Sequence, residues 1–172
     1  YHSGSSIVLQ RPHYRWDLRE YIRRHKEHRR TQNDKVVSGL SVCTIKNLLQ
    51  QILSGLAHCH SVNVMHRNLK PENILVDEEP HSVDGSLLAC ISDFALSRAI
   101  QIPHLNKYTP EDPKERERSG RESRRLYYRA PELMFRPNQY STEVDIWSVG
   151  CLLAEMATTE PLFKATYEIE LL

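Results

Sequence analysis

The chain has 172 residues, of which 40% are hydrophobic and 26% are charged, and its formal net charge is +1 at pH 7. This length is enough to bury a core and is typical of one soluble domain. The balanced charge argues against a nucleic-acid or membrane partner.

The cysteines and the apolar runs narrow the class of protein further. Four cysteines are scattered along the chain without a C-x-x-C pair, which argues against a zinc site or a disulfide framework. Such usage favours a reducing compartment, the cytoplasm or the nucleus, and we expect these thiols to fill the core. The longest mostly apolar run, residues 146–157, is too short to span a bilayer, and no charged-then-apolar leader opens the sequence. Since the sequence begins with Tyr1 and not with Met, we expect a piece of a longer protein.

A short strand and a helix are the first elements expected along the chain. Residues 7–9 are aliphatic and mostly β-branched, as in a strand, and Pro12 interrupts the run. Residues 16–22 then have helical spacing. The basic run at residues 23–30 has two interpretations, a nucleic-acid patch or a solvated helix end with its loop. The second is favoured, because the net charge is near zero and no aromatic residues are interleaved.

The most regular pattern in the sequence predicts a long amphipathic helix with Ser41 as its N-cap. Apolar residues recur at i, i+3, i+4 and i+7, which indicates one wide buried stripe over about five turns. The stripe consists of Ile45, Leu48, Leu49, Ile52, Leu53, Leu56 and Ala57. Asn63 offers a left-handed stop for this helix, just before Val64 and Met65.

The segment that follows this helix carries the densest chemistry in the sequence. Residues 66–73 read His-Arg-Asn-Leu-Lys-Pro-Glu-Asn and combine a cation suited to phosphate with an amide suited to a metal ion. Residues 74–76 predict a strand, and residues 87–91 its antiparallel partner after a polar excursion at 77–86. Asp93, Phe94 and Ala95 come directly after this second strand.

A charged segment and two ordered motifs complete the sequence. Residues 114–125 mix both signs of charge and have little to bury, so we expect a mobile loop there. Residues 126–133 read Leu-Tyr-Tyr-Arg-Ala-Pro-Glu-Leu. Residues 140–156 read Tyr-Ser-Thr-Glu-Val-Asp-Ile-Trp-Ser-Val-Gly-Cys-Leu-Leu-Ala-Glu-Met.

These motifs, in this order, resemble the large lobe of protein kinases. Residues 66–73 resemble the catalytic loop H-R-D-L-x-x-x-N, residues 93–95 resemble D-F-G, and residues 130–132 resemble A-P-E. The cyclin-dependent and mitogen-activated (CMGC) branch is similar in further segments, which are residues 126–133, 140–156, 161–163 and 167–172. The resemblance implies an α+β, protein-kinase-like fold that is mostly the helical C-terminal lobe, with the small lobe absent.

The resemblance also implies how the chain divides. Residues 1–172 form a partial kinase domain, in which residues 1–16 are the end of the small lobe and the hinge, with Pro12 in or next to the hinge. Residues 17–172 are the large lobe, truncated before its last helices. The Gly-rich loop and the phosphate-binding lysine of a kinase would then lie upstream, and the Arg partner of Glu132 would lie downstream.

ATP and Mg²⁺ are the cofactors that the resemblance implies, with weak or no binding expected for this chain alone. Asn68 stands where kinases place the catalytic Asp, and Lys70 matches the lysine that follows it. The residues that match nucleotide-binding positions are Lys70, Asn73, Leu75 and Asp93. Of these, Asn73 and Asp93 match the metal ligands, and Leu75 matches the residue under adenine. His66 matches a structural histidine.

Other positions match substrate-binding, regulatory and scaffold residues of the branch. Arg129 matches the arginine that helps to read a proline after the target residue, and Asp145 matches a buried carboxylate that bonds the catalytic-loop backbone. Arg67 and Arg98 match two arginines that grip a phosphate on the activation loop. The candidate phosphorylation sites in this segment are Thr109, Ser119 and Ser123.

Three departures from the kinase pattern put activity in doubt. Asn68 is an amide and has no accessible basic form near neutral pH. Arg125 replaces the Thr whose hydroxyl bridges the catalytic Asp and Lys. Ala95 replaces a glycine, which costs energy if the backbone φ there is positive.

Two functions therefore remain open. The first is a cyclin-dependent-kinase-like enzyme that transfers the ATP γ-phosphate to proline-directed Ser/Thr, impaired by Asn68, Ala95, Arg125 and truncation. The alternative is a non-catalytic pseudokinase, a binding or scaffold module that presents Arg129 or the charged loop to a partner. The expected partners are a protein substrate or binding protein, and a cyclin-like subunit for the full-length protein.

Overall fold

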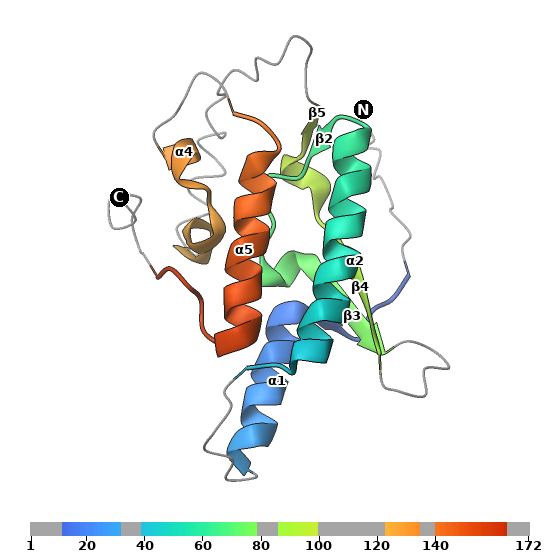
Figure 1. Cartoon of the computed structure of the whole chain (residues 1–172), viewed down its shortest axis with the longest axis vertical. Coiled ribbons are helices and arrows are strands. Elements are labelled where there is room, and N and C mark those ends of the chain that lie inside the picture. Colours follow the sequence, from blue (N-terminus) through green and yellow to red (C-terminus); the bar gives the residue numbers. More distant parts are fainter. Residues whose placement is uncertain (1–11, 32–38, 79–85, 100–122, 135–139, 165–172) are drawn as a thin grey trace, which may run out of the picture.

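The computed structural model describes residues 12–31, 39–78, 86–99, 123–134 and 140–164. Three main helices dominate it (Figure 1), α1 (Leu18–Thr31), α2 (Val42–Ser61) and α5 (Glu143–Thr158), with a single turn at α4 (Pro131–Met134). The predicted strand at residues 7–9 and the tail at 167–172 lie outside the described residues. No helix in the described part of the chain has both the length and the apolar character that crossing a bilayer requires.

Two small antiparallel sheets accompany the helices, which gives the α+β architecture that was predicted. The strands β1 (Trp16–Asp17), β3 (Ile74–Glu78) and β4 (Leu87–Ile91) form one sheet in the order β1-β3-β4. A second sheet pairs β2 (Val64–Met65) with β5 (Arg98–Ala99). Short 3₁₀ turns complete the elements, and they are η1 (Pro71–Asn73), η2 (Phe94–Leu96) and η3 (Ser123–Tyr128).

Helix α1 begins later than its sequence pattern predicted. Trp16 and Asp17 are extended and pair with Val76 and Leu75 of β3, so the helix starts at Leu18. The side chain of Asp17 accepts a hydrogen bond of 2.8 Å from the backbone N–H of Glu20, which is the bond of a helix N-cap. The basic run at 23–30 lies wholly within α1, where Arg23 and Arg24 bond Glu20. The predicted solvated helix end is therefore present, and α1 continues to Thr31.

Helix α2 has the predicted cap and a narrower buried stripe than predicted. The Ser41 hydroxyl accepts from Thr44 N–H at 3.1 Å, and Asn63 ends the segment with φ 60°. Leu48, Ile52 and Leu56 are fully buried, but Leu53 is 43% exposed, and Ala57 is also exposed. A step of four residues turns a helix by about 40° beyond one full turn. Side chains that follow each other at this step, at positions 45, 49, 53 and 57, therefore point progressively away from the core and toward solvent.

The β-hairpin has the predicted strands, with one difference in extent. Ile74 pairs with Ile91 and Glu78 with Leu87, so β3 continues through Asp77 and Glu78, which were expected to open the polar excursion. Both acidic side chains lie near the Arg15 guanidinium, whose opposite charge favours them on this strand.

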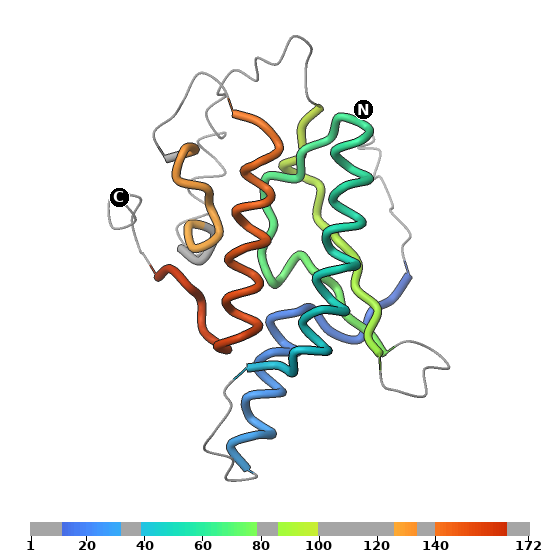
Figure 2. The backbone as a smooth tube through the Cα atoms, in the orientation of Figure 1, coloured from blue at the N-terminus to red at the C-terminus, as the bar shows by residue number. Residues whose placement is uncertain are grey.

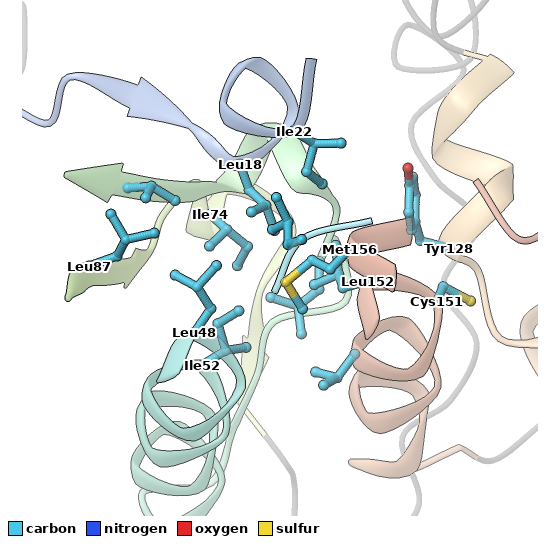
Figure 3. Close-up of a cluster of buried hydrophobic side chains, with 14 of the residues drawn as sticks. Leu18, Ile22, Leu48, Ile52, Ile74, Leu87, Tyr128, Cys151, Leu152 and Met156 are labelled. Atoms are coloured by element: carbon cyan, nitrogen blue, oxygen red, sulfur yellow. The ribbon is translucent and has the colours of Figure 1, made fainter. Parts of the chain in front are cut away.

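The core lies where α1, α2, the hairpin and α5 meet (Figure 3). Its members are apolar side chains from all four parts and from η3, among them Leu18, Ile22, Leu48, Ile52, Ile74, Leu87, Tyr128, Leu152 and Met156. Gly39 allows the chain to approach the end of α5, because a Cβ there would lie 1.9 Å from the carbonyl oxygen of Ala157. The neighbouring Leu40 N–H donates to Met156 O at 2.8 Å and fixes this approach.

Two predictions about burial were wrong in part. Only Cys151 of the four cysteines is buried, Cys59 and Cys90 are half-buried, and Cys43 is exposed; all four are free thiols. The resemblance of residues 140–156 to the kinase branch implies a central buried helix, yet one side of α5 is open. Its exposed apolar residues are Ile146, Trp147 and Leu153, whereas Val144, Val149, Leu152 and Met156 are buried.

Candidate functional site

The loop at residues 66–73 is fixed by a buried carboxylate of α5. Asp145 is fully buried, and its two oxygens accept from the backbone N–H groups of His66 at 2.9 Å and Arg67 at 2.7 Å. His60, at the end of α2, bonds the same carboxylate at 2.9 Å. The predicted bond between Asp145 and the loop backbone is confirmed, whereas the role of His60 was not foreseen. Figure 2 shows the loop running beside α5 on its way from β2 to β3.

His66 is a packed structural residue, as expected. Its Nε2 lies 2.9 Å from the carbonyl oxygen of Ser92, and its Nδ1 accepts from the backbone N–H of Asn68 at 3.2 Å. These partners require the neutral tautomer with the proton on Nε2. Burial lowers the pKa of His66, which agrees with a neutral ring. The ring also contacts Phe94 edge to face, with centroids 4.7 Å apart.

Arg67 has a left-handed backbone, with φ 64°, and its side chain is bound within the chain. Its guanidinium donates to the carbonyl oxygen of Leu96 and to the hydroxyl of Tyr140, both at 2.7 Å. Arg98 lies close by in β5, opposite Met65 of β2. The two arginines predicted to grip a phosphate thus lie at the same end of the loop. Thr109 and Ser119 lie outside the described residues, and only the backbone of Ser123 is described, in η3.

Asn68, Asn73 and Asp93 come together at the open end of the β3–β4 hairpin. Ser92 N–H donates to Asn73 O at 2.8 Å, which continues the hairpin pairing by one step and places Asp93 directly beyond it. The Asn73 side-chain amide donates to Asn68 O at 2.8 Å. The Asn68 side-chain amide in turn donates to the Asp93 carboxylate at 3.2 Å. Lys70, between the two asparagines, is 7% exposed.

A pocket with a volume of ≈ 690 Å³ adjoins this cluster. Its lining comes from the segment before β1, from β3, from the end of β4 and from the residues after β4. It consists of Pro12, Tyr14, Leu75, Cys90, Ile91, Ser92, Asp93, Phe94 and Ala95. Leu75 and Asp93, predicted to contact the base and the metal, therefore face the same space. Pro12, predicted to lie in or next to the hinge, is at its edge. The size and mostly apolar lining are typical of a small-molecule site.

The Asp93-Phe94-Ala95 segment differs from expectation in two respects. The left-handed φ of 63° belongs to Asp93, while Ala95 is not among the described residues with positive φ. Ala95 lies in the 3₁₀ turn η2, so the expected backbone strain at this alanine is absent here. The D-F-G resemblance implies a Phe that packs into the core, but Phe94 is 41% exposed against the His66 ring.

The donor set fits a magnesium ion and a nucleotide phosphate. Mg²⁺ prefers oxygen ligands and is usually held by one or two carboxylates together with phosphate oxygens. Asp93 offers such oxygens to the pocket, and the buried Asn73 lies next to it in the cluster, through Asn68. Within the described ranges, no group of three or more His, Cys, Asp and Glu gathers as a metal site. The set thus suits a cation shared with a nucleotide rather than one held by protein alone.

A buried polar cluster behind the loop was missed by sequence reasoning. Arg19 of α1 binds Glu72 of η1, and it also donates to the Tyr128 hydroxyl at 2.9 Å. Tyr128 donates to Glu155 of α5, whose carboxylate lies 3.6 Å from Arg19. Burial raises the pKa of Glu155, although the Tyr128 bond and the Arg19 charge act in the opposite direction. No spacing in the sequence indicates this cluster, because its members are up to 136 positions apart in α1 and α5.

Comparison with known proteins agrees with this geometry. Residues 7–171 match the protein kinase domain. The chain belongs to the protein kinase family. It is 38% identical over 154 residues to cyclin-dependent kinase B2-1 of Oryza sativa subsp. japonica, which covers 90% of this chain and 39% of that relative. This kinase chain therefore spans well under half the length of the curated relative that it matches.

The remaining predicted site residue of this kinase chain lies outside this cluster. Arg129 follows η3, is half-buried, and donates its backbone N–H to Leu126 O at 3.2 Å. It is joined to the core by its neighbour Tyr128, whose carbonyl oxygen accepts from the Ser148 hydroxyl at 2.7 Å. The structure thus places Leu75 and Asp93 in the lining of one pocket and joins Asn68 and Asn73 to Asp93 by hydrogen bonds, while Arg129 belongs to a separate segment.

Proposed function

We propose that this chain is the large-lobe part of a cyclin-dependent-kinase-like Ser/Thr kinase domain, in which the step that removes the hydroxyl proton is impaired. The observation that carries the proposal is the state of Asn68. Its amide nitrogen donates to Asp93, and its side-chain oxygen is buried without a protein hydrogen-bond partner. An amide at this position has no basic form near neutral pH, so it cannot take the proton of a substrate hydroxyl.

The roles of the other residues follow from the cluster. Asn73 and Asp93 would hold Mg²⁺, Lys70 would face the transferred phosphate, and Leu75 would contact the base. When bound, ATP supplies the γ-phosphate and Mg²⁺ offsets its charge. Asp145 keeps the loop backbone in place through two N–H bonds, so that Asn68 and Asn73 stay in register. Phosphoryl transfer depends chiefly on positioning, so a chain with this loop geometry retains much of what the reaction needs.

We propose that Arg67 and Arg98 bind a phosphate group carried by Thr109, Ser119 or Ser123. Arg67 already holds Leu96 O and the Tyr140 hydroxyl, so a phosphate would join an ordered guanidinium rather than a free one. Arg129 would face the residue after the target Ser/Thr. A protein substrate and a cyclin-like subunit are the partners that fit this proposal.

The alternative is a pseudokinase module that binds a protein partner without phosphoryl transfer. It is favoured by the same Asn68–Asp93 bond, since that bond satisfies the carboxylate without a catalytic cation. The two functions differ in what Asn68→Asp would do.

The test grafts residues 1–172 onto an intact small lobe and the last helices of a cyclin-dependent relative, and measures phosphate transfer to a Ser-Pro peptide. Asn68→Asp should raise turnover by up to ~10²–10⁴-fold, the range that a positioned base supplies. Arg125→Thr should help more in the Asn68→Asp background than with Asn68 in place, because residues that work as a unit are not additive. No gain from either change would contradict the kinase proposal and favour the pseudokinase. Full activity of the unchanged graft would show that Asn68 impairs nothing.

A further inference from the structure

Arg67 joins three separate parts of the chain. Its backbone N–H donates to Asp145 of α5, and its guanidinium donates to the carbonyl oxygen of Leu96 and to the hydroxyl of Tyr140, each at 2.7 Å. Leu96 ends the 3₁₀ turn η2, which follows Asp93 directly, and Tyr140 comes shortly before α5. Arg67 therefore connects the segment that carries Asp93 to the start of α5.

Neither acceptor balances the charge of this guanidinium. Arg67 is half-buried, and both side-chain acceptors that the described residues offer it, the Leu96 carbonyl and the Tyr140 hydroxyl, are neutral. A second cation, Arg98, lies opposite Met65 of β2, shortly before Arg67 in the sequence. Like charges repel, so the Arg67 side chain keeps one position only if its neutral acceptors hold it there.

Tyr140 offers this cation an acceptor that is itself fixed. The residue is 7% exposed, so its ring has little room to move. The ring lies in a small apolar cluster with Met65, Ala130, Leu133 and Val144. Because the phenol oxygen is part of the rigid ring system, packing of the ring also fixes the position of the hydroxyl. The bond from Arg67 to Tyr140 therefore costs less side-chain entropy than a bond to a flexible acceptor would.

We propose that Tyr140 is a positioning residue, whose hydroxyl is the internal ligand that keeps Arg67 in place when no anion is bound there. The inference concerns regulation, and it rests on the phosphate-binding role proposed above for Arg67 and Arg98. It adds that the 66–73 loop and the turn after Asp93 are arranged before a phosphate arrives. A phosphate then joins an arranged site, and only a chain without the Tyr140 hydroxyl needs the anion to arrange it.

The test follows the Arg67 Nε–H signal of the ¹⁵N-labelled 172-residue chain by NMR, because this proton donates to Leu96 O and its exchange with solvent reports on that bond. In chloride buffer, Tyr140→Phe should speed the exchange by about tenfold or more, the factor that a hydrogen bond to a charged group supplies. Inorganic phosphate at equal ionic strength should bring Tyr140→Phe back to within about threefold of the unchanged chain, whose own exchange should hardly change.

The matched control is Tyr21→Phe. It removes a hydroxyl from a half-buried tyrosine of α1 that packs against the main core and not beside Arg67. Its Arg67 Nε–H should exchange as in the unchanged chain, in chloride and in phosphate alike.

The other outcomes separate this inference from the phosphate site. If phosphate slows the exchange equally in the unchanged chain and in Tyr140→Phe, the phosphate site stands and the inference is wrong. If phosphate does not restore Tyr140→Phe, both fail. Unchanged exchange in Tyr140→Phe, or equal acceleration in Tyr21→Phe, would exclude a special role of the Tyr140 hydroxyl. If Tyr140→Phe does not fold, the unchanged chain decides: in chloride its Arg67 Nε–H should exchange at least about tenfold more slowly than that of the exposed Arg30, with no further slowing in phosphate. Equal rates, or a large effect of phosphate, would overturn the proposal.

Discussion

The substitution Asp145→Asn tests whether one buried carboxylate holds the 66–73 loop. In the native chain, Oδ1 accepts from Arg67 N–H, and Oδ2 accepts from His66 N–H and from His60. An asparagine must turn its NH₂ toward one of these two sides. The least costly orientation turns the NH₂ toward Arg67, so the Arg67 N–H loses its acceptor. The amide oxygen then accepts from His66 N–H and His60, in bonds that are no longer assisted by a negative charge.

The expected cost follows from these contacts. Losing a charge-assisted bond and leaving a buried donor unpaired should lower the free energy of unfolding by about 2–4 kcal/mol. That is a large part of the ~5–15 kcal/mol that stabilises a typical domain. With a urea slope near 2 kcal/mol per molar, the midpoint of unfolding should fall by about 1–2 M.

The assay is urea unfolding followed by circular dichroism, with Glu143→Gln as the control. Glu143 is exposed in the first turn of the same helix, so its substitution removes a similar charge without touching the loop. It should cost less than about 1 kcal/mol, the usual limit for a surface charge at a helix N-terminus. Equal midpoints for Asp145→Asn and Glu143→Gln would refute the idea that Asp145 organises the loop.

Three further substitutions, the first with a matched control, test other parts of the fold. Gly39→Ala should lower the free energy of unfolding by about 1–3 kcal/mol in the same assay, because its Cβ would collide with Ala157 O. The control is Gly150→Ala, whose Cβ would have no neighbouring atom within 4 Å, and it should be neutral or stabilising. Ser41→Ala should cost about 1 kcal/mol by removing the α2 cap. The Glu155→Gln protein should gain stability relative to the native chain as pH rises above 4.5, the ordinary pKa of Glu155. Unfolding of both proteins at several pH values measures this difference.

The sign of the pH prediction comes from the raised pKa of Glu155. Between 4.5 and the higher pKa in the folded chain, the folded state binds more protons than the unfolded state, so stability falls as pH rises. Glutamine does not titrate and removes this loss. A pH-independent difference between the two proteins would contradict the raised pKa. For the glycines, equal effects of Gly39→Ala and Gly150→Ala would show that the close approach to α5 is not tight.

Local patterns in the sequence were sufficient for the regular elements. Ser41 and the apolar period predicted α2, and the two β-rich runs predicted the β3–β4 hairpin. Trp16 and Asp17 were misassigned because helical spacing at residues 16–22 competes with strand pairing to β3, which is a contact that spacing does not reveal. Leu53 fits the apolar period yet is exposed, because the period alone does not show how wide the buried face of α2 is.

The candidate site was predicted where its residues lie in one short motif. Asn68, Asn73 and Asp93 were named from sequence, and they do meet at the end of the hairpin. The direction of the Asn68–Asp93 bond and the His60 contact with Asp145 depend on side-chain placement, so no pattern of residue types could give them. The same is true of the Arg19 cluster, whose partners come from distant helices.

The bond between His66 and Asp145 spans 79 positions in the sequence, which has a consequence for the order of folding. At a synthesis rate of 5–20 residues per second, α5 leaves the ribosome roughly 4–16 s after the loop that it holds. Helix α2 can form locally during that time, but the N–H groups of His66 and Arg67 have no acceptor from α5 yet. The loop should therefore be among the last parts to become ordered. Substitutions within it should speed unfolding while leaving the rate of folding nearly unchanged.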